Sequence, residues 1–125
     1  MPVVKVWCLP ADLTEEQLQA LHRSIVDEAV SMPEFGIRDE KHITVLFPPD
    51  MMKYGLGSEI IIEVLTGVFH RLELPDEYKT KFARAMVRAV KRLHPGPMVE
   101  CFIQPFKQED GFYHCLEGDR VPPDE

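Results

Sequence analysis

Pro2 has the most distinctive chemical potential in this sequence. The chain begins Met1-Pro2, and an initiator methionine is commonly removed before a residue as small as proline. After removal, the Pro2 nitrogen is a secondary amine, and a free α-amino group titrates near ~8. Packing among apolar side chains disfavours the charged amine and lowers its pKa toward neutrality. Pro2 is then a candidate general base. While Met1 stays attached, the same nitrogen belongs to an amide and is not basic.

Four other side chains have chemistry that suits a small acidic substrate. Arg71 can bind a carboxylate through two hydrogen bonds, and Asp39 can orient a water molecule or hold a protonated amine. His42 and His70 are potential acid–base groups near neutral pH. The alternative for all four is structural, with the charged groups pairing with sequence neighbours and the histidines at strand edges or on the surface. No pair of histidine, cysteine or acidic residues has metal-ligand spacing, and the sequence predicts neither a metal nor another cofactor.

Strands and helices that must position these residues alternate along the chain. Hydrophobic and β-branched runs predict four strands, at residues 1–9, 42–47, 60–65 and 98–104. The strand predicted at residues 60–65 has apolar side chains on both of its faces, which indicates that both faces are covered. The segment after it, residues 67–73, is predicted to be a connection.

Two amphipathic segments with helical spacing lie between the strands. The first begins at Thr14, which can form a capping box with Gln17, and ends near Ser31. The second begins at Asp76, whose charge suits the positive end of the helix dipole, and ends before Pro95. Basic residues that cover much of the second helix are expected to be a solvated face.

Composition limits the function classes. The chain has 125 residues, 45% hydrophobic and 28% charged, as in a globular domain with a modest core. Its formal net charge of −7 argues against a general nucleic-acid or anionic-membrane surface. There is no apolar run long enough to cross a membrane and no secretion signal, and we expect a cytoplasmic protein.

The order of elements indicates an internal duplication of a β-α-β unit. The two units span about 1–57 and 58–116 and are joined by a loop with two glycines. Each strand-helix-strand connection is long enough for a right-handed parallel crossover. We predict an α/β (α+β) fold: one domain, residues 1–118, with a four-stranded mixed sheet and two helices on one face. Residues 119–125 form an acidic, proline-containing tail. Oligomerisation is the simplest cover for the second sheet face.

Several short motifs in this order resemble the tautomerase superfamily, and in particular its malonate semialdehyde decarboxylase-like and short uncharacterised members. The motifs are Pro2, Arg38-Asp39, Tyr54-Gly55-Leu56-Gly57, Arg71, and the last strand with the turn that leads to Phe112. The likeness covers the chain up to about residue 116. Where the decarboxylases carry two close arginines, this sequence has Arg71 alone, beside His70.

The resemblance implies a homotrimer that uses the amino-terminal proline as base or acid on an enol, a 2-oxo acid or a related small carboxylate. Pro2, Asp39 and Arg71 would be catalytic. Tyr54, His70 and Phe112 would bind the substrate.

Two alternatives share the same element order. One is a catalytically silent trimeric module for binding or assembly on the same fold, which the single arginine favours. The other is a ferredoxin-like dimeric domain, which also has two β-α-β units.

Overall fold

The computed structural model describes residues 2–49 and 59–111, and the statements below concern these residues. The strands are β1 (Val3–Trp7), β2 (Thr44–Leu46), β3 (Glu59–Thr66) and β4 (Met98–Pro105). The helices are α1 (Glu15–Val30), the single turn α2 (Val68–Arg71) and α3 (Glu77–Lys91). Short 3-10 turns occupy η1 (Pro33–Phe35), η2 (Glu40–His42) and η3 (Gln108–Asp110).

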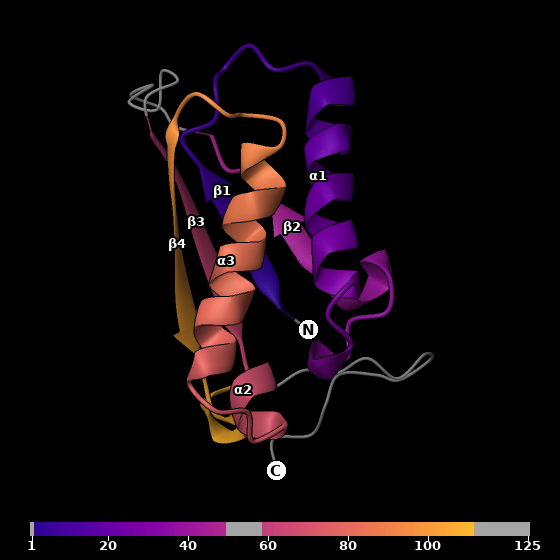
Figure 1. Cartoon of the computed structure of the whole chain (residues 1–125), viewed down its shortest axis with the longest axis vertical. Coiled ribbons are helices and arrows are strands. Elements are labelled where there is room, and N and C mark those ends of the chain that lie inside the picture. Colours follow the sequence, from indigo (N-terminus) through magenta and orange to yellow (C-terminus); the bar gives the residue numbers. More distant parts are fainter. Residues whose placement is uncertain (1, 50–58, 112–125) are drawn as a thin grey trace.

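The strands form one mixed sheet in the order β2-β1-β3-β4. Strands β1 and β2 are parallel, β3 and β4 are parallel, and β1 is antiparallel to β3. Each β-α-β unit therefore supplies two adjacent strands, and the two units meet at β1 and β3. A ferredoxin-like domain is built from split β-α-β units, in which another strand separates the parallel pair. The sheet excludes that alternative and confirms the predicted duplicated fold with two helices on one face (Figure 1).

Helix α1 begins as the sequence predicts. The Thr14 hydroxyl accepts a hydrogen bond from the Gln17 backbone N–H at 3.2 Å, and the Gln17 side chain accepts one from the Thr14 N–H at 2.8 Å. This reciprocal pair satisfies two donors that the first helical turn leaves unpaired. The helix ends at Val30 with Ser31 as its C-cap, in agreement with the predicted end.

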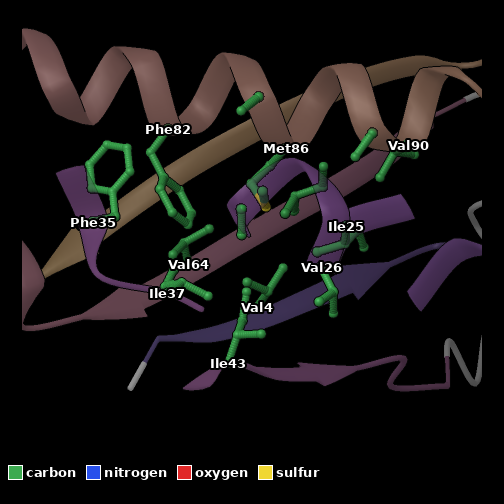
Figure 2. Packing of buried hydrophobic residues seen from close by; sticks show 14 of the residues in the cluster. Val4, Ile25, Val26, Phe35, Ile37, Ile43, Val64, Phe82, Met86 and Val90 are labelled. Atoms are coloured by element: carbon green, nitrogen blue, oxygen red, sulfur yellow. The ribbon is translucent and has the colours of Figure 1, made fainter. Parts of the chain in front are cut away.

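The core lies between the helices and one face of the sheet (Figure 2). Alternate residues of β1 and β3 point into it, and the register pairs Val4 with Val64. Phe35 of η1 closes one end of this core, with its ring 5.0 Å from that of Phe82 and 5.8 Å from that of Phe69. Aromatic edge-to-face contacts of this kind add to the energy of burial. The loop after α1 and the turn α2 are thereby fixed to the end of α3.

Three predicted segments differ from the structure. The strand predicted at residues 1–9 is shorter, because β1 spans Val3–Trp7 and Cys8 leaves the extended conformation with a φ of 70°. The connection at residues 67–73 contains the helical turn α2, because Val68 and Phe69 bury their side chains there. The strand predicted at 42–47 is shorter, since His42 belongs to η2 and only Thr44–Leu46 pairs with β1.

The glycine-containing loop with Tyr54, the residue Phe112 and the predicted tail at 119–125 lie outside the described residues. Within the described ranges, none of the helices combines the length and the apolar character needed to span a bilayer.

Candidate functional site

Two of the residues singled out by the sequence, Pro2 and Arg71, lie toward one end of the sheet. Strands β1 and β2 begin at this end, and β3 and β4 finish there (Figure 1). The register fixes the arrangement, because Val3 lies opposite Thr44 on one side and opposite Leu65 on the other. Pro2 precedes this row, and α2 follows the strand that lies beside β1.

Pro2 is buried at the start of β1. Its carbonyl oxygen accepts a hydrogen bond from the Thr44 backbone N–H at 2.9 Å, which extends the parallel ladder by one residue. The neighbouring strands place Ile43 and Thr66 one step beyond the paired row, and both are buried, at 4% and 0% exposure. Proline can occupy this first strand position because no donor is needed there. The Pro2 ring is therefore excluded from solvent, with buried Ile43 and Thr66 to either side.

The turn from β3 into α2 is fixed by backbone contacts. The hydroxyl of Thr66 accepts a hydrogen bond from the Val68 N–H at 3.1 Å, and its carbonyl accepts one from the Phe106 N–H at 3.0 Å. The Phe106 ring lies against Gly67, where a Cβ atom would stand 2.9 Å from Cε2 of that ring. Only a residue without a side chain fits this contact unchanged. The end of β4 thus sets the direction in which α2 leaves the sheet.

Arg71 and His70 are both exposed at the end of α2. The structural alternative for Arg71 was an ion pair with Glu73 or Asp76. Within residues 2–49 and 59–111, Arg71 forms no ion pair, and Asp76 instead binds Lys79 with Nζ 3.0 Å from Oδ1. As far as the described residues show, the Arg71 guanidinium is exposed and available to bind an anion at this end of the sheet.

Asp39 and His42 occupy the turn that leads into β2. The Asp39 carboxylate caps η2, with Oδ1 accepting a hydrogen bond from the Lys41 backbone N–H at 2.7 Å. The Nδ1 atom of His42 accepts one from the Arg38 N–H at 3.1 Å, so the neutral ring carries its proton on Nε2. Both side chains are exposed, and both have the local structural role that was the alternative to catalysis.

Asp39 also lines a groove of about 600 Å³ between α1 and the segment before β2. One wall of the groove is a face of α1, with Gln19, His22, Arg23, Val26, Asp27 and Val30. The opposite wall is short and consists of Arg38, Asp39 and Glu40. Neither Pro2 nor Arg71 lines this groove. Asp39 is therefore displaced toward the outer side of α1, whereas Pro2 and α2 belong to the adjacent strands β1 and β3.

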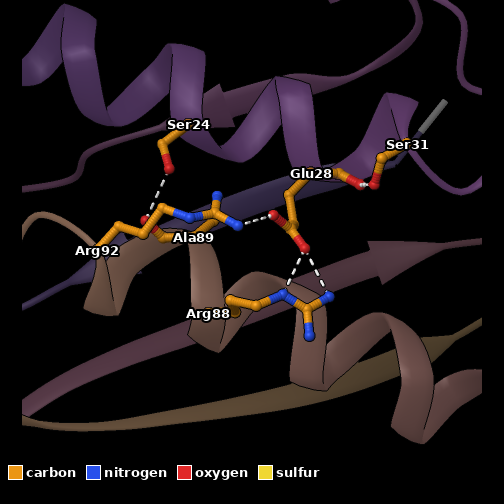
Figure 3. A network of polar contacts seen from close by, with 6 residues as sticks. All are labelled: Ser24, Glu28, Ser31, Arg88, Ala89 and Arg92. Carbon is orange, nitrogen blue, oxygen red and sulfur yellow. Dashed lines mark hydrogen bonds and ion pairs between the residues drawn. The ribbon is translucent and has the colours of Figure 1, made fainter.

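The sequence analysis missed a polar cluster between the two long helices (Figure 3). The carboxylate of Glu28 on α1, whose side chain is 8% exposed, accepts a hydrogen bond from Arg88 Nε at 2.6 Å and binds Arg92 Nη2 at 2.7 Å. Burial raises the pKa of Glu28, but hydrogen bonds from Arg92 and Arg88 outweigh it and leave the pKa below its ordinary value. The signal was present, since Leu21, Ile25 and Glu28 follow the spacing of one helix face.

The basic residues of α3 at positions 81, 88 and 92 are exposed, as expected of a solvated face, but all three also bind acidic side chains. Arg88 and Arg92 bind Glu28, and Lys81 binds Glu34 of η1 with Nζ 2.6 Å from Oε2. Ser24 adds a hydrogen bond from its hydroxyl to the Ala89 carbonyl at 2.8 Å. These contacts join α1 and η1 to α3, and their role is structural.

Comparisons with known proteins were made by sequence and by structure. Neither a family model nor a curated protein matches the sequence. Solved structures match over most of the chain. A structure described as the F6 fused 4-OT wild-type asymmetric trimer shares 12% identity, covers 94% of each chain and has a TM-score of 0.64. The macrophage migration inhibitory factor of Toxoplasma gondii is 16% identical, with a TM-score of 0.59 over 94% of this chain and 97% of its own.

A third similar structure is FG41 malonate semialdehyde decarboxylase, at 17% identity and a TM-score of 0.60, covering 90% of this chain and 89% of its own. All three proteins are members of the tautomerase superfamily. This chain has the tautomerase fold. The resemblance predicted from the sequence is confirmed at the level of the fold, and identities this low carry neither the activity nor the substrate across. In the tautomerase fold of this chain, Pro2 directly precedes the first strand.

Proposed function

We propose that this chain is a tautomerase-like enzyme in which the Pro2 amine, freed by removal of Met1, transfers a proton on a small 2-oxo or enol carboxylate. The observation that carries the proposal is the position of Pro2. Pro2 directly precedes β1, it is buried, and α2 with Arg71 follows the end of the strand beside β1. A base and a cation are thereby brought to one end of the sheet.

The chemistry requires a base that is partly neutral near pH 7. An amine removed from water is harder to protonate, and the burial of Pro2 next to the buried side chain of Ile43 supports this condition. In the proposed reaction, the Pro2 nitrogen takes the proton that leaves the carbon next to the substrate carbonyl. The carbonyl oxygen gains a proton from water, which gives the enol, and the hydroxide left behind takes the proton from the Pro2 ammonium, so that water and the neutral amine are regenerated. The reverse sequence returns the proton to carbon.

Arg71 is the proposed anchor for the substrate carboxylate. Its guanidinium has no ion pair within the described parts of the chain, and α2 holds its backbone at the sheet end. A guanidinium can bind a carboxylate through two parallel hydrogen bonds, which fixes both position and orientation. His70, Tyr54 and Phe112 are proposed to contact the remainder of the substrate.

Asp39 is the proposed polar partner of the reaction. One carboxylate oxygen is engaged by the Lys41 N–H, and the side chain faces the groove beside α1. A role in catalysis requires that it act through a water molecule or in an assembled form of the protein.

We further propose that the enzyme is a cytoplasmic homotrimer. The sheet face away from the helices carries exposed apolar side chains, and one similar structure is described as a trimer. The alternative is a silent assembly module, and the Met1-Pro2 sequence favours it for as long as Met1 is retained, because the amide nitrogen of Pro2 is not basic.

Intact mass of the protein isolated from its own host separates these two functions. A mass that lacks Met1 is expected, and such protein should interconvert the keto and enol forms of phenylpyruvate, used here as a probe. Protein that keeps Met1, or that lacks it and shows no turnover of the probe or of related 2-oxo acids, would favour the assembly module.

A further inference from the structure

Thr66, the last residue of β3, is fully buried, and Glu28 is the other buried polar residue in the described part of the chain. Two arginines bind Glu28, whereas a single partner is found for the Thr66 hydroxyl. Its oxygen accepts a hydrogen bond from the Val68 N–H at 3.1 Å, and of the described residues none accepts the hydroxyl proton. Because a buried donor without an acceptor is costly, this proton requires an acceptor nearby.

Pro2 lies directly across the sheet from Thr66. Strands β1 and β3 are antiparallel with Val3 opposite Leu65, so the next step of the register places Pro2 opposite Thr66. At this step the two backbones turn away from each other. The Pro2 carbonyl bonds to β2, through the Thr44 N–H, and the Thr66 carbonyl bonds to the residue that follows β4. An antiparallel pair of this kind, without mutual hydrogen bonds, is the closer one, with Cα atoms about 4.5 Å apart.

The Thr66 hydroxyl and the Pro2 nitrogen lie on the same side of this pair. Both residues alternate with the strand so as to share the core face with Val4 and Val64, which pair with each other and are fully buried (Figure 2). The bond from Val68 draws the hydroxyl oxygen toward the end of β3. Since β1 runs the opposite way, the same direction leads from the Pro2 Cα to the Pro2 nitrogen. The nitrogen is therefore the nearest acceptor that the register offers.

Charged groups do not reach Pro2 from the elements around it. The neighbouring segments carry exposed charged and titratable residues, at positions 38–42 before β2, 70, 71 and 73 in and after α2, and 107, 109 and 110 after β4. The opposite sheet face carries the charges of β1 and β3, at positions 5, 59 and 63. On the helix side, Glu28 and Glu34 bind basic residues of α3, and His22 faces the groove that Pro2 does not line.

We propose that the Thr66 hydroxyl donates a hydrogen bond to the Pro2 nitrogen once Met1 is removed, and so favours the unprotonated, basic form of the amine. A hydrogen bond to the neutral form disfavours the charged form and lowers the pKa of the amine. The Val68 N–H already occupies the hydroxyl oxygen, which makes the hydroxyl a better donor than acceptor. This role deepens the proposed function of Pro2 and rests on it. Thr66 acts through Pro2 and is a positioning residue.

The test is an NMR titration of the Pro2 amine in the full chain without Met1, with all prolines labelled with 15N. Of the 11 prolines, Pro2 alone has an amine nitrogen, so its 15N chemical shift reports this protonation directly. Thr66→Val keeps the shape of the side chain and removes the hydroxyl. It should raise the pKa of Pro2 by about one, which corresponds to one hydrogen bond.

The same change should appear in kinetics. A higher pKa keeps the amine protonated to higher pH, so the acidic limb of the profile of kcat/KM for phenylpyruvate should move to higher pH in Thr66→Val. Below both pKa values the variant should be about tenfold slower than the wild type. Thr66→Ser restores the hydroxyl, and its Pro2 pKa should lie within about 0.3 of the wild type.

Ser24→Ala is the matched control, because it removes a hydroxyl that donates to the Ala89 carbonyl between the helices, away from Pro2. It should leave the pKa of Pro2 unchanged. Circular dichroism shows whether each variant is folded, and Thr66→Ala, which removes the same hydroxyl with a smaller side chain, replaces Thr66→Val if that variant does not fold.

A Pro2 pKa that is unchanged or lower in a folded Thr66→Val protein would overturn the proposed hydrogen bond, since the hydroxyl would then serve only to bind Val68. A rise that Ser24→Ala shares would overturn it as well. A raised pKa in protein that does not turn over phenylpyruvate supports the hydrogen bond and contradicts the proposed function. Turnover that depends on Pro2, with a pKa insensitive to Thr66, supports the function and contradicts the hydrogen bond.

Discussion

The Glu28 carboxylate on α1 is bound by the Arg88 guanidinium on α3, with Nε 2.6 Å from Oε1. This contact joins the two long helices, which lie side by side on one face of the sheet (Figure 1). Arg92 binds the second carboxylate oxygen from the same helix. The acid is nearly buried, whereas the guanidinium groups of Arg88 and Arg92 are about half exposed. Loss of the arginines would leave the Glu28 carboxylate buried without a partner, whereas loss of Glu28 would leave both guanidinium groups in contact with water.

Replacing Glu28 by glutamine should destabilise the protein by about 2 kcal/mol, because a buried charge-assisted hydrogen bond is lost while both guanidiniums keep access to water. Urea unfolding measures the free energy of unfolding. Glu16→Gln, on the exposed part of the same helix, serves as the control and should change it by less than about 0.5 kcal/mol. Equal effects of the two substitutions would show that the contact does not stabilise the fold.

The stabilisation by Glu28 should depend on pH in one direction. Its pKa in the folded protein lies below the ordinary value of 4.5, so the folded state favours the ionised carboxylate. The contribution is complete above that ordinary value and is lost as the pH falls through the folded pKa. The difference in unfolding free energy between the wild type and Glu28→Gln should therefore shrink below about pH 4.5. A difference that is constant down to about pH 3 would contradict this assignment.

The contact between Gly67 and Phe106 predicts a specific pattern of couplings. Gly67→Ala places a methyl group 2.9 Å from the Phe106 ring and should cost about 1 kcal/mol through displacement of that ring. In a Phe106→Ala background the same substitution should cost much less, because the obstacle is gone. A double-mutant cycle by urea unfolding measures the coupling. Equal costs in both backgrounds would mean that the ring does not constrain this turn.

Arg71 should matter for binding of the substrate carboxylate and little for stability. Its side chain is exposed and has no ion pair within the described ranges, so Arg71→Gln should leave the unfolding free energy within about 0.5 kcal/mol of the wild type. We expect kcat/KM for phenylpyruvate to fall by about tenfold to a hundredfold. Arg84→Gln, an exposed arginine on α3, is the control. Equal kinetics of the two variants would remove Arg71 from the site.

The sequence was sufficient to predict the elements of the fold because each has a strong local signal. The capping box at Thr14 marks the start of α1, and the run of isoleucine and valine marks β3. Duplication of the β-α-β unit then leaves few ways to arrange four strands. Local signals do not determine how the two units meet. In the structure they meet through the antiparallel pairing of β1 with β3.

The site could be predicted only in part. The position of Pro2 follows from its place at the start of a strand, whereas the position of Asp39 depends on how η2 turns before β2. Glu28 escaped notice because a charged residue on a helix is ordinarily solvated, and its partners lie 60 residues or more along the chain. The diagonal placement of Glu59 and Glu100 on one sheet face depends on the register of β3 and β4, which the sequence of neither strand specifies alone.

The central claim is that the Pro2 amine carries the proton, and the most direct measurement is kcat/KM for phenylpyruvate with protein shown by intact mass to lack Met1. Pro2→Ala replaces the secondary amine and its ring, and it should lower kcat/KM by about a hundredfold or more with the fold retained. Wild-type protein prepared with Met1 retained should be equally impaired, because its Pro2 nitrogen is an amide. Turnover that is unchanged in both preparations would contradict the account.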